Sequence, residues 1–193
     1  MRKQKKQGGF TLVEIAIVMV IIGLLLGGAL KGQEMIQNAK TKRIKADFDQ
    51  YVAAFYSYQD IYRALPGDNK KAETQHGYSA DTYDGDGNGI VEDADQGKFW
   101  ANLRAAGLIS GSATDLTMPR NAFGGDITPV SDGADMGDHA FCFANIDQKI
   151  ALIIDNNYDD GEGKTGAVRG VASGTLGTAI DYVAGQNVLC MKI

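Results

Sequence analysis

The stretch Gly9-Phe10-Thr11-Leu12-Val13-Glu14, continued by apolar residues as far as Leu30, decides how this chain is organised. From Phe10 to Leu30 there are 21 residues with one ionisable side chain, Glu14, and a helix of that length crosses the roughly 30 Å hydrocarbon core of a membrane. Four basic residues precede the span and none lies within it. The positive-inside bias then keeps residues 1–9 in the cytoplasm and places the chain after the span outside it. We therefore predict a membrane-spanning helix over 10–30 behind a basic leader.

The helical pattern continues beyond this apolar span. Aromatic and apolar residues recur at spacings of three and four, which puts them on one face of a helix: Phe48, Tyr51, Val52, Phe55, Tyr58 and Tyr62. Pro66 ends the pattern, because proline lacks an amide donor and restricts the residue before it. We expect one helix over 10–64, membrane-spanning in its first half and packed by one stripe against a globular domain (65–193) in its second half.

Two simpler interpretations of the N-terminal segment stay open. A secretory signal would be cleaved at Gly27-Gly28-Ala29, but Glu14 interrupts its apolar core and the helical pattern continues past the site. A plain membrane anchor has no use for an acid, since a carboxylate at mid-membrane costs about 3 kcal/mol and calls for a partner. If the chain is cleaved after Gly9, the new amine of Phe10 in a neighbouring copy can reach Glu14 and set the register between two helices.

Together, these residues resemble the cleavage and methylation signature of type IV prepilins and type II secretion pseudopilins. The basic leader, Gly9, Phe10 and Glu14 occur in the arrangement that these families share. The resemblance implies cleavage after Gly9 by a membrane prepilin peptidase, N-methylation of Phe10, and packing of many such helices into a filament core. It also implies that Glu14 neutralises the Phe10 amine of an adjacent subunit. The implied partners are identical or related subunits, the peptidase and an inner-membrane assembly machinery.

Length and charge narrow the classes of function. A chain of 193 residues has room for one globular domain and an appended segment. The formal charge is -5, and because four of the 19 basic residues precede Gly9, the chain from Phe10 onward carries -9. Such an acidic body argues against nucleic-acid binding. We interpret the one basic cluster, Lys40, Lys42, Arg43 and Lys45, as a solvated or headgroup-facing turn of the helix.

The chain contains two cysteines, Cys142 and Cys190. An even number behind an export-like N-terminus favours one disulfide formed in an oxidising compartment. Two separate buried thiols are the alternative.

An acidic loop offers a metal site. Oxygen donors follow the spacing of an EF-hand calcium loop, with Gly89 at the sharp turn, and the candidate ligands are Asp84, Asp86, Asn88, Ile90 through its carbonyl, Glu92 and Asp95. The last position holds Asp95 instead of the longer glutamate. A solvated acidic turn is the alternative, because short Asp/Gly loops give false matches.

The remaining segments alternate between loops and short elements. Gly and Asp abound in 65–95 and 110–138, which predicts loops, with one or two short edge strands in the second. Helices are expected at Asp95–Ala106 and Asp147–Asn157, and strands at His139–Phe143, Ala167–Ala172 and Val188–Ile193. The acidic turn 156–162 could bind a cation together with Asp155, but its spacing matches no metal-site template, and we interpret it as solvated. The fold class is therefore α+β: a long N-terminal helix packed on a small antiparallel β-sheet, with extra short helices and long loops.

The sequence thus favours a structural subunit of a type IV pilus-like helical filament. It is expected first as a single-pass inner-membrane precursor with its C-terminal domain outside the cytoplasm, and then in an extracellular pilus. A pseudopilin of a type II secretion system, in a periplasmic pseudopilus, is the alternative. A monomeric membrane-tethered, calcium-dependent binding module is a second alternative. No enzymatic activity is expected, because no nucleophile elbow, phosphate loop or Cys-x-x-Cys is present.

Overall fold

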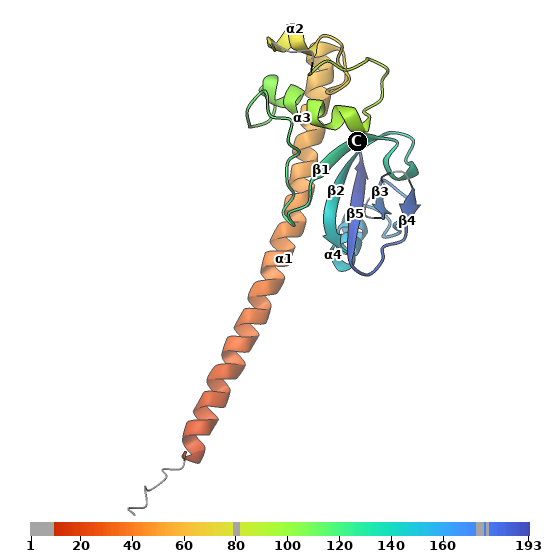
Figure 1. The fold of residues 1–193 in the computed structure, drawn as a ribbon. Coiled ribbons are helices and arrows are strands. Elements are labelled where there is room, and N and C mark those ends of the chain that lie inside the picture. Colours follow the sequence, from red (N-terminus) through yellow and green to blue (C-terminus); the bar gives the residue numbers. More distant parts are fainter. Residues whose placement is uncertain (1–9, 79–81, 173–175, 177) are drawn as a thin grey trace, which may run out of the picture. The chain divides into compact units, whose positions relative to one another are not determined.

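A computed structural model describes residues 10–78, 82–172, 176 and 178–193 (Figure 1). The predicted leader 1–9, including Gly9, lies outside the described residues. The chain divides into two compact units, Met1–Ala39 and Lys40–Ile193. The helix α1, Leu12–Tyr62, runs through both units and confirms the long N-terminal helix.

The second half of α1 carries the predicted apolar stripe. Four of its apolar or aromatic side chains are buried, and four more are half-buried against the same core: Ile44, Ala54, Phe55 and Tyr58, then Phe48, Tyr51, Val52 and Tyr62. The helix ends at Tyr62, slightly before the predicted residue 64, because Arg63 adopts a left-handed conformation with φ of 55°. That conformation stops the helix three residues before Pro66.

A five-stranded antiparallel sheet forms the centre of the second unit. Its strands are β1 (Ile127–Ser131), β2 (His139–Asp147), β3 (Val168–Val171), β4 (Ala179–Ile180) and β5 (Gln186–Lys192), in the order β1-β2-β5-β3-β4. The strands predicted around 139–143, 167–172 and 188–193 are confirmed with shifted ends. Strand β1 confirms an edge strand in the segment 110–138. A bulge between Phe143 and Ile146 places Asn145 at a φ of 63°.

The two faces of the sheet bury two clusters of unequal size. Alternation along β2 directs Phe141 and Phe143 to one face, where they meet α1, α3 (Gln96–Ala105) and α4 (Gln148–Tyr158) in the main core. Trp100 of α3 lies fully buried there and stacks on Phe141. The intervening residues of β2, including Cys142, face a smaller cluster that the turn η2 (Gly133–Asp135) helps to bury.

Short helices complete the fold. The helix predicted at 147–157 is confirmed as α4, and Asp147 caps it by accepting a hydrogen bond from the Lys149 amide. The segment 65–95 was predicted as loop throughout, which is wrong at two places, since it contains the five-residue helix α2 (Ala72–His76) and the 3-10 turn η1 (Asp93–Asp95). Helix α2 buries only Ala72 and ends at Gly77, so it has no apolar period that the sequence pattern would reveal.

Candidate functional sites

The N-terminus of α1 is closed by two side chains that bond each other's backbone. Glu14 Oε2 accepts hydrogen bonds from Thr11 N at 2.8 Å and from Thr11 Oγ1 at 2.9 Å, while Glu14 N donates to Thr11 Oγ1 at 3.2 Å. This is a capping box, in which the first residue and the one three positions later satisfy each other's amides. The pairing of Glu14 with a neighbouring subunit, predicted from the sequence, is thus joined by a local role within its own helix. The pattern Thr-x-x-Glu is the signal that would have revealed the local one.

Apolar side chains cover the helix surface that follows. From Leu12 to Leu30 the large apolar side chains are exposed, and Phe10 before them is 84% exposed. By length and composition, α1 is the one helix among the described residues that can cross a membrane. Phe10 and Glu14 line the same shallow hollow of about 360 Å³ with three apolar neighbours. The oxygen Oε1 of Glu14 has no hydrogen-bond partner within the described part of the chain, so one carboxylate oxygen stays available.

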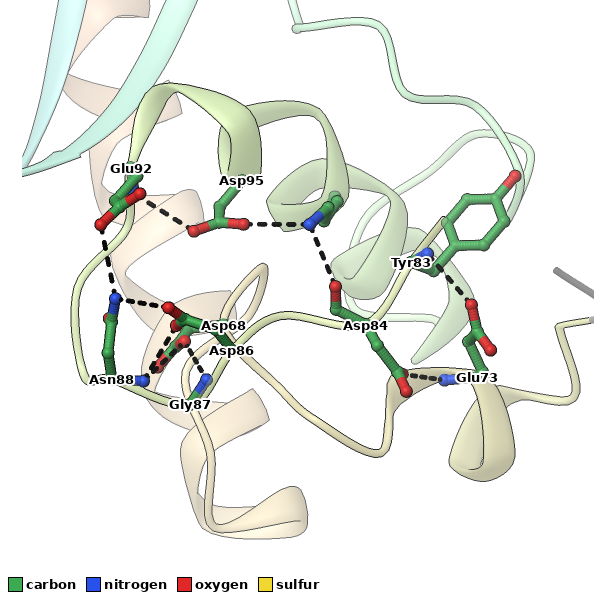
Figure 2. A network of polar contacts seen from close by, with 10 residues as sticks. Asp68, Glu73, Tyr83, Asp84, Asp86, Gly87, Asn88, Glu92 and Asp95 are labelled. Atoms are coloured by element: carbon green, nitrogen blue, oxygen red, sulfur yellow. Dashed lines mark hydrogen bonds and ion pairs between the residues drawn. The ribbon is translucent and has the colours of Figure 1, made fainter. Parts of the chain in front are cut away.

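In the predicted calcium loop, three of the six candidate ligands lie together (Figure 2). Asp86 accepts hydrogen bonds from Asn88 N at 3.1 Å and from Asn88 Nδ2 at 2.9 Å, and Glu92 Oε1 accepts from the same Nδ2 at 3.4 Å. Asn88 Oδ1 accepts from Ile90 N at 2.7 Å, so that side chain already organises the turn. The amide of Asn88 thus bridges the two carboxylates.

Two other candidate ligands are turned toward different partners. Asp84 Oδ1 accepts from Glu73 N at 2.8 Å, and Asp95 Oδ2 accepts from Glu92 N at 3.3 Å in a second capping box. Lys98 Nζ donates to the Asp84 carbonyl at 3.0 Å and to Asp95 Oδ1 at 3.2 Å. An ammonium group therefore balances this side of the loop. The four carboxylates among the candidate ligands do not gather into one cluster of the described residues, as EF-hand coordination requires, and calcium binding stays a prediction.

Asp68 organises the same loop from outside it. Its carboxylate accepts hydrogen bonds from the amides of Gly87 (2.6 Å), Asn88 (3.1 Å) and Gly89 (2.8 Å), and the residue is 4% exposed. Burial raises the pKa of Asp68. A Cβ added to Gly85 would lie 2.3 Å from Asp68 Cα, so the two segments fit only with glycine there. The sequence places Asp68 in the loop predicted after Pro66, and no pattern in it signals this pairing across the chain.

A second group of carboxylates lies at the C-terminal end of α4 and in the turn that follows it. One oxygen from each of Asp155, Asp159 and Asp160 lies within 4.8 Å of the others. Asp155 is fully buried and accepts from the Tyr182 hydroxyl at 2.7 Å and from Gly161 N at 3.1 Å, and burial raises its pKa. The exposed Asp160 agrees with a solvated turn at 156–162, whereas Asp155 lies within α4 and its carboxylate accepts from a tyrosine hydroxyl. Cation binding by this group stays a prediction.

The two cysteines form one disulfide. Cys142 and Cys190 are directly opposite each other on β2 and β5, are buried, and are joined by an S–S bond of 2.00 Å. This confirms the predicted bond and removes the alternative of two separate thiols.

The basic cluster on α1 is largely paired. Arg43 donates to Asp47 at 2.6 Å, Lys45 forms an ion pair with Asp49, and Lys40 lies over the ring of Phe123. Lys42 of this cluster is exposed. The cluster therefore contributes local contacts of the second unit instead of forming one continuous basic face.

Comparison with known proteins supports the N-terminal assignment. Residues 4–30 match the family model of the prokaryotic N-terminal methylation motif. This match confirms the methylation signature that the sequence predicted around Gly9, Phe10 and Glu14. No curated protein matches the sequence. Among solved structures, the chain is similar to the major type IV pilin PilA1 from Clostridium difficile, with a TM-score of 0.45 and 9% identity over 82% of this chain and 98% of that one.

Proposed function

We propose that this protein is a structural subunit of a type IV pilus-like helical filament, which assembles through α1 after cleavage between Gly9 and Phe10. The observation that carries the proposal is the position of Glu14. It is the single acid in an apolar helix surface that the subunit itself leaves exposed, and it lies within the matched methylation motif. An exposed apolar surface of this size requires a membrane or other helices to cover it.

Packing against neighbouring helices would stabilise this surface in two ways: it would cover the apolar side chains, and it would give the Glu14 carboxylate a partner. Their packing would take the side chains from Leu12 to Leu30 out of contact with lipid or water. Cleavage would free an amine on Phe10, and the unpartnered Oε1 of Glu14 would accept a hydrogen bond from that amine in the adjacent subunit. Because the carboxylate alone costs about 3 kcal/mol at mid-membrane, this pair would favour one axial register over others.

The order of events follows from the same residues. The precursor would be held in the inner membrane by α1, with the domain beyond it outside the cytoplasm, where the Cys142–Cys190 disulfide is compatible with an oxidising compartment. A prepilin peptidase and an inner-membrane assembly machinery would then process the subunit and add it to the filament. Repeated head-to-tail contacts that do not close would give a helical polymer.

A periplasmic pseudopilus of a secretion system is the alternative within the same class. Long fibres that shearing releases from cells support a pilus. If no such fibres are released, but the subunit still polymerises in the periplasm and secretion depends on it, a pseudopilus is supported. A monomeric tethered module that binds through the loop 84–95 belongs to a different class, and it requires no polymer at all.

Variants at Glu14 test the proposal and separate its two roles. Glu14→Gln keeps the capping box, because glutamine serves at this position too, but it removes the charge. We expect Glu14→Gln to abolish filament formation as completely as Glu14→Ala does, measured by electron microscopy of sheared material. Thr11→Ala removes the cap and keeps the charge, and Glu34→Ala removes an exposed acid paired with Lys31. Both of these controls are expected to assemble.

Normal filaments from Glu14→Gln would contradict the proposal, because the acid would then serve only as a helix cap. The membrane level of each variant is measured by immunoblot, so that a loss of polymer is not confused with a loss of protein.

A further inference from the structure

A hollow of about 530 Å³ lies at the C-terminal end of α1, where the chain turns toward α2. It belongs entirely to the unit Lys40–Ile193. Cationic and amide side chains line it, together with one half-buried aromatic ring: Arg63, Lys70, Lys71, Asn69, Gln75 and Tyr62. Neither the filament contacts nor the calcium loop accounts for this group of side chains.

The cations of the hollow are unpaired in an acidic environment. Residues 64–193 contain nine Lys and Arg against 19 Asp and Glu, so acidic partners are abundant. Elsewhere in the second unit some basic side chains are paired, as Lys98 is with Asp95 and Lys164 with Asp181, whereas Lys42 and Lys149 form no ion pair with a described residue. Across the residues that the structure describes, Arg63, Lys70 and Lys71 form no ion pair. Three uncompensated cations around one concave surface attract an anion.

Hydrogen-bond donors in the hollow are held in place by its wall. Gln75 Oε1 accepts from Asn69 Nδ2 at 2.7 Å, which leaves the Gln75 Nε2 group as a donor. The stem of Lys70 lies across the backbone of Gly87, where an added Cβ would come within 2.5 Å of Lys70 Cε. The stem of Lys70 therefore contacts the wall of the hollow at Gly87, while the residue as a whole is exposed.

The acid of the hollow is already satisfied. Asp68 is the one acidic residue among the described lining residues, and both of its oxygens accept amide hydrogen bonds from the loop 87–89. Its charge is therefore compensated by three amide dipoles and opposes an incoming anion only weakly.

The conformation of Arg63 gives an independent indication. Its φ of 55° lies in the left-handed region, which glycine adopts at helix ends without steric cost and arginine does not. Arg63 thus carries a long side chain at a position where the backbone conformation favours glycine. Residues in such strained backbone conformations cluster at binding sites.

We propose that this hollow binds an oxyanion, a phosphate or carboxylate group, carried on a sugar-sized molecule. The three cations and the Gln75 amide would hold the oxyanion, since guanidinium and ammonium groups give strong charge-assisted bonds to such groups. The volume is that of a small-molecule site and exceeds what a bare phosphate fills. The ring of Tyr62 offers an apolar face for the remainder of the ligand.

Isothermal titration of the full chain in a nonionic detergent, at constant ionic strength and without calcium, tests this. The ligands are glucose 6-phosphate, glucuronate and inorganic phosphate, with glucose as the neutral control. We expect saturable one-site binding of glucose 6-phosphate or glucuronate, weaker binding of inorganic phosphate and none of glucose. The first two ligands distinguish a phosphate from a carboxylate as the preferred group. Absence of saturable binding by both anionic sugars overturns the proposal.

Matched variants locate the binding. The double variant Lys70→Gln/Lys71→Gln is expected to weaken it about tenfold or more, the effect of losing a charge-assisted hydrogen bond. The double variant Lys42→Gln/Lys149→Gln removes two exposed cations elsewhere and is expected to leave it unchanged. Equal weakening in both doubles would show a diffuse charge effect and would overturn the site.

Arg63→Gly separates binding from folding, because the two effects have opposite signs. Glycine relieves the left-handed conformation, so the thermal midpoint is expected to stay the same or rise while anion binding weakens. A variant that binds as tightly as the parent chain would remove Arg63 from the site and contradict the assignment.

Discussion

Replacing Asp68 by alanine should destabilise the second unit by about 3 kcal/mol. The carboxylate accepts three amide hydrogen bonds of 2.6, 3.1 and 2.8 Å that hold the turn 87–89 against the end of α1. A bond to a charged group contributes about 1.5–3 kcal/mol, but burial raises the pKa of Asp68 and so offsets part of that gain. The turn itself is exposed, so water can hydrate the freed amides. We therefore assign about 1 kcal/mol to each of the three bonds.

The assay is urea unfolding of the full chain in nonionic micelles, followed by the fluorescence of Trp100. Trp100 is the single tryptophan and is fully buried against Phe141, so its emission reports the main core. Asp68→Asn retains one acceptor oxygen and should lose about 1–2 kcal/mol. Asp126→Ala serves as the control, because its side chain is exposed and forms a surface ion pair with Arg120 at 3.6 Å, and it should lose under about 1 kcal/mol. If Asp68→Ala were no more destabilising than this control, the carboxylate would not hold the turn.

Three further changes have defined outcomes. The double variant Cys142→Ala/Cys190→Ala opens a loop with a sequence separation of 48 and should lose about 4 kcal/mol of unfolding free energy in urea, and a loss under about 1 kcal/mol would contradict that role. Burial lowers the pKa of His139, so the stability that its neutral form contributes is present above about pH 6.5 and is lost as the pH falls through the lowered value. His139→Gln should therefore reduce the fall of the urea midpoint between about pH 7 and 5. If the midpoint fell as steeply as in the parent chain, His139 would not be the source of this pH dependence. For the calcium prediction, titration calorimetry at millimolar calcium should give heat that Asp86→Ala abolishes and Asp93→Ala, a neighbouring acid outside the predicted ligand set, retains; no heat in the parent chain would end it.

The fold could be predicted where local patterns carry the information. The stripe from Phe48 to Tyr62 repeats at helical spacing, and this is the face that packs on the sheet. Strand β2 alternates, and its two faces bury different clusters. The strand order could not be read in this way, because β5 pairs between β2 and β3 through contacts between residues distant in sequence.

In the candidate sites, too, local patterns could be predicted and contacts between distant segments could not. Glu14 and the two cysteines were found because each has few possible partners, whereas the capping role of Thr11 was overlooked although its pattern is local. The calcium template identified a loop of acids but not the direction of each side chain. Lys98 and Asp68, which respectively balance and anchor that loop, come from separate segments and match no sequence template.

The hollow at the end of α1 is a further feature beyond the sequence pattern. Arg63, Lys70 and Lys71 are near one another in the chain, but nothing in the sequence shows that they stay unpaired among so many acids. That property depends on where each carboxylate is directed, and Asp68 is directed into the loop by three backbone amides.

The central claim concerns a processed subunit in a polymer, and the N-terminal peptide of that polymer tests it most directly. Material sheared from cells is digested and the N-terminal peptide is identified by mass spectrometry. The account predicts a chain that begins at Phe10 with a methylated amine, in material that electron microscopy shows as filaments. A chain that begins at Leu30, or an unprocessed Met1 in a monomeric membrane protein, would contradict it.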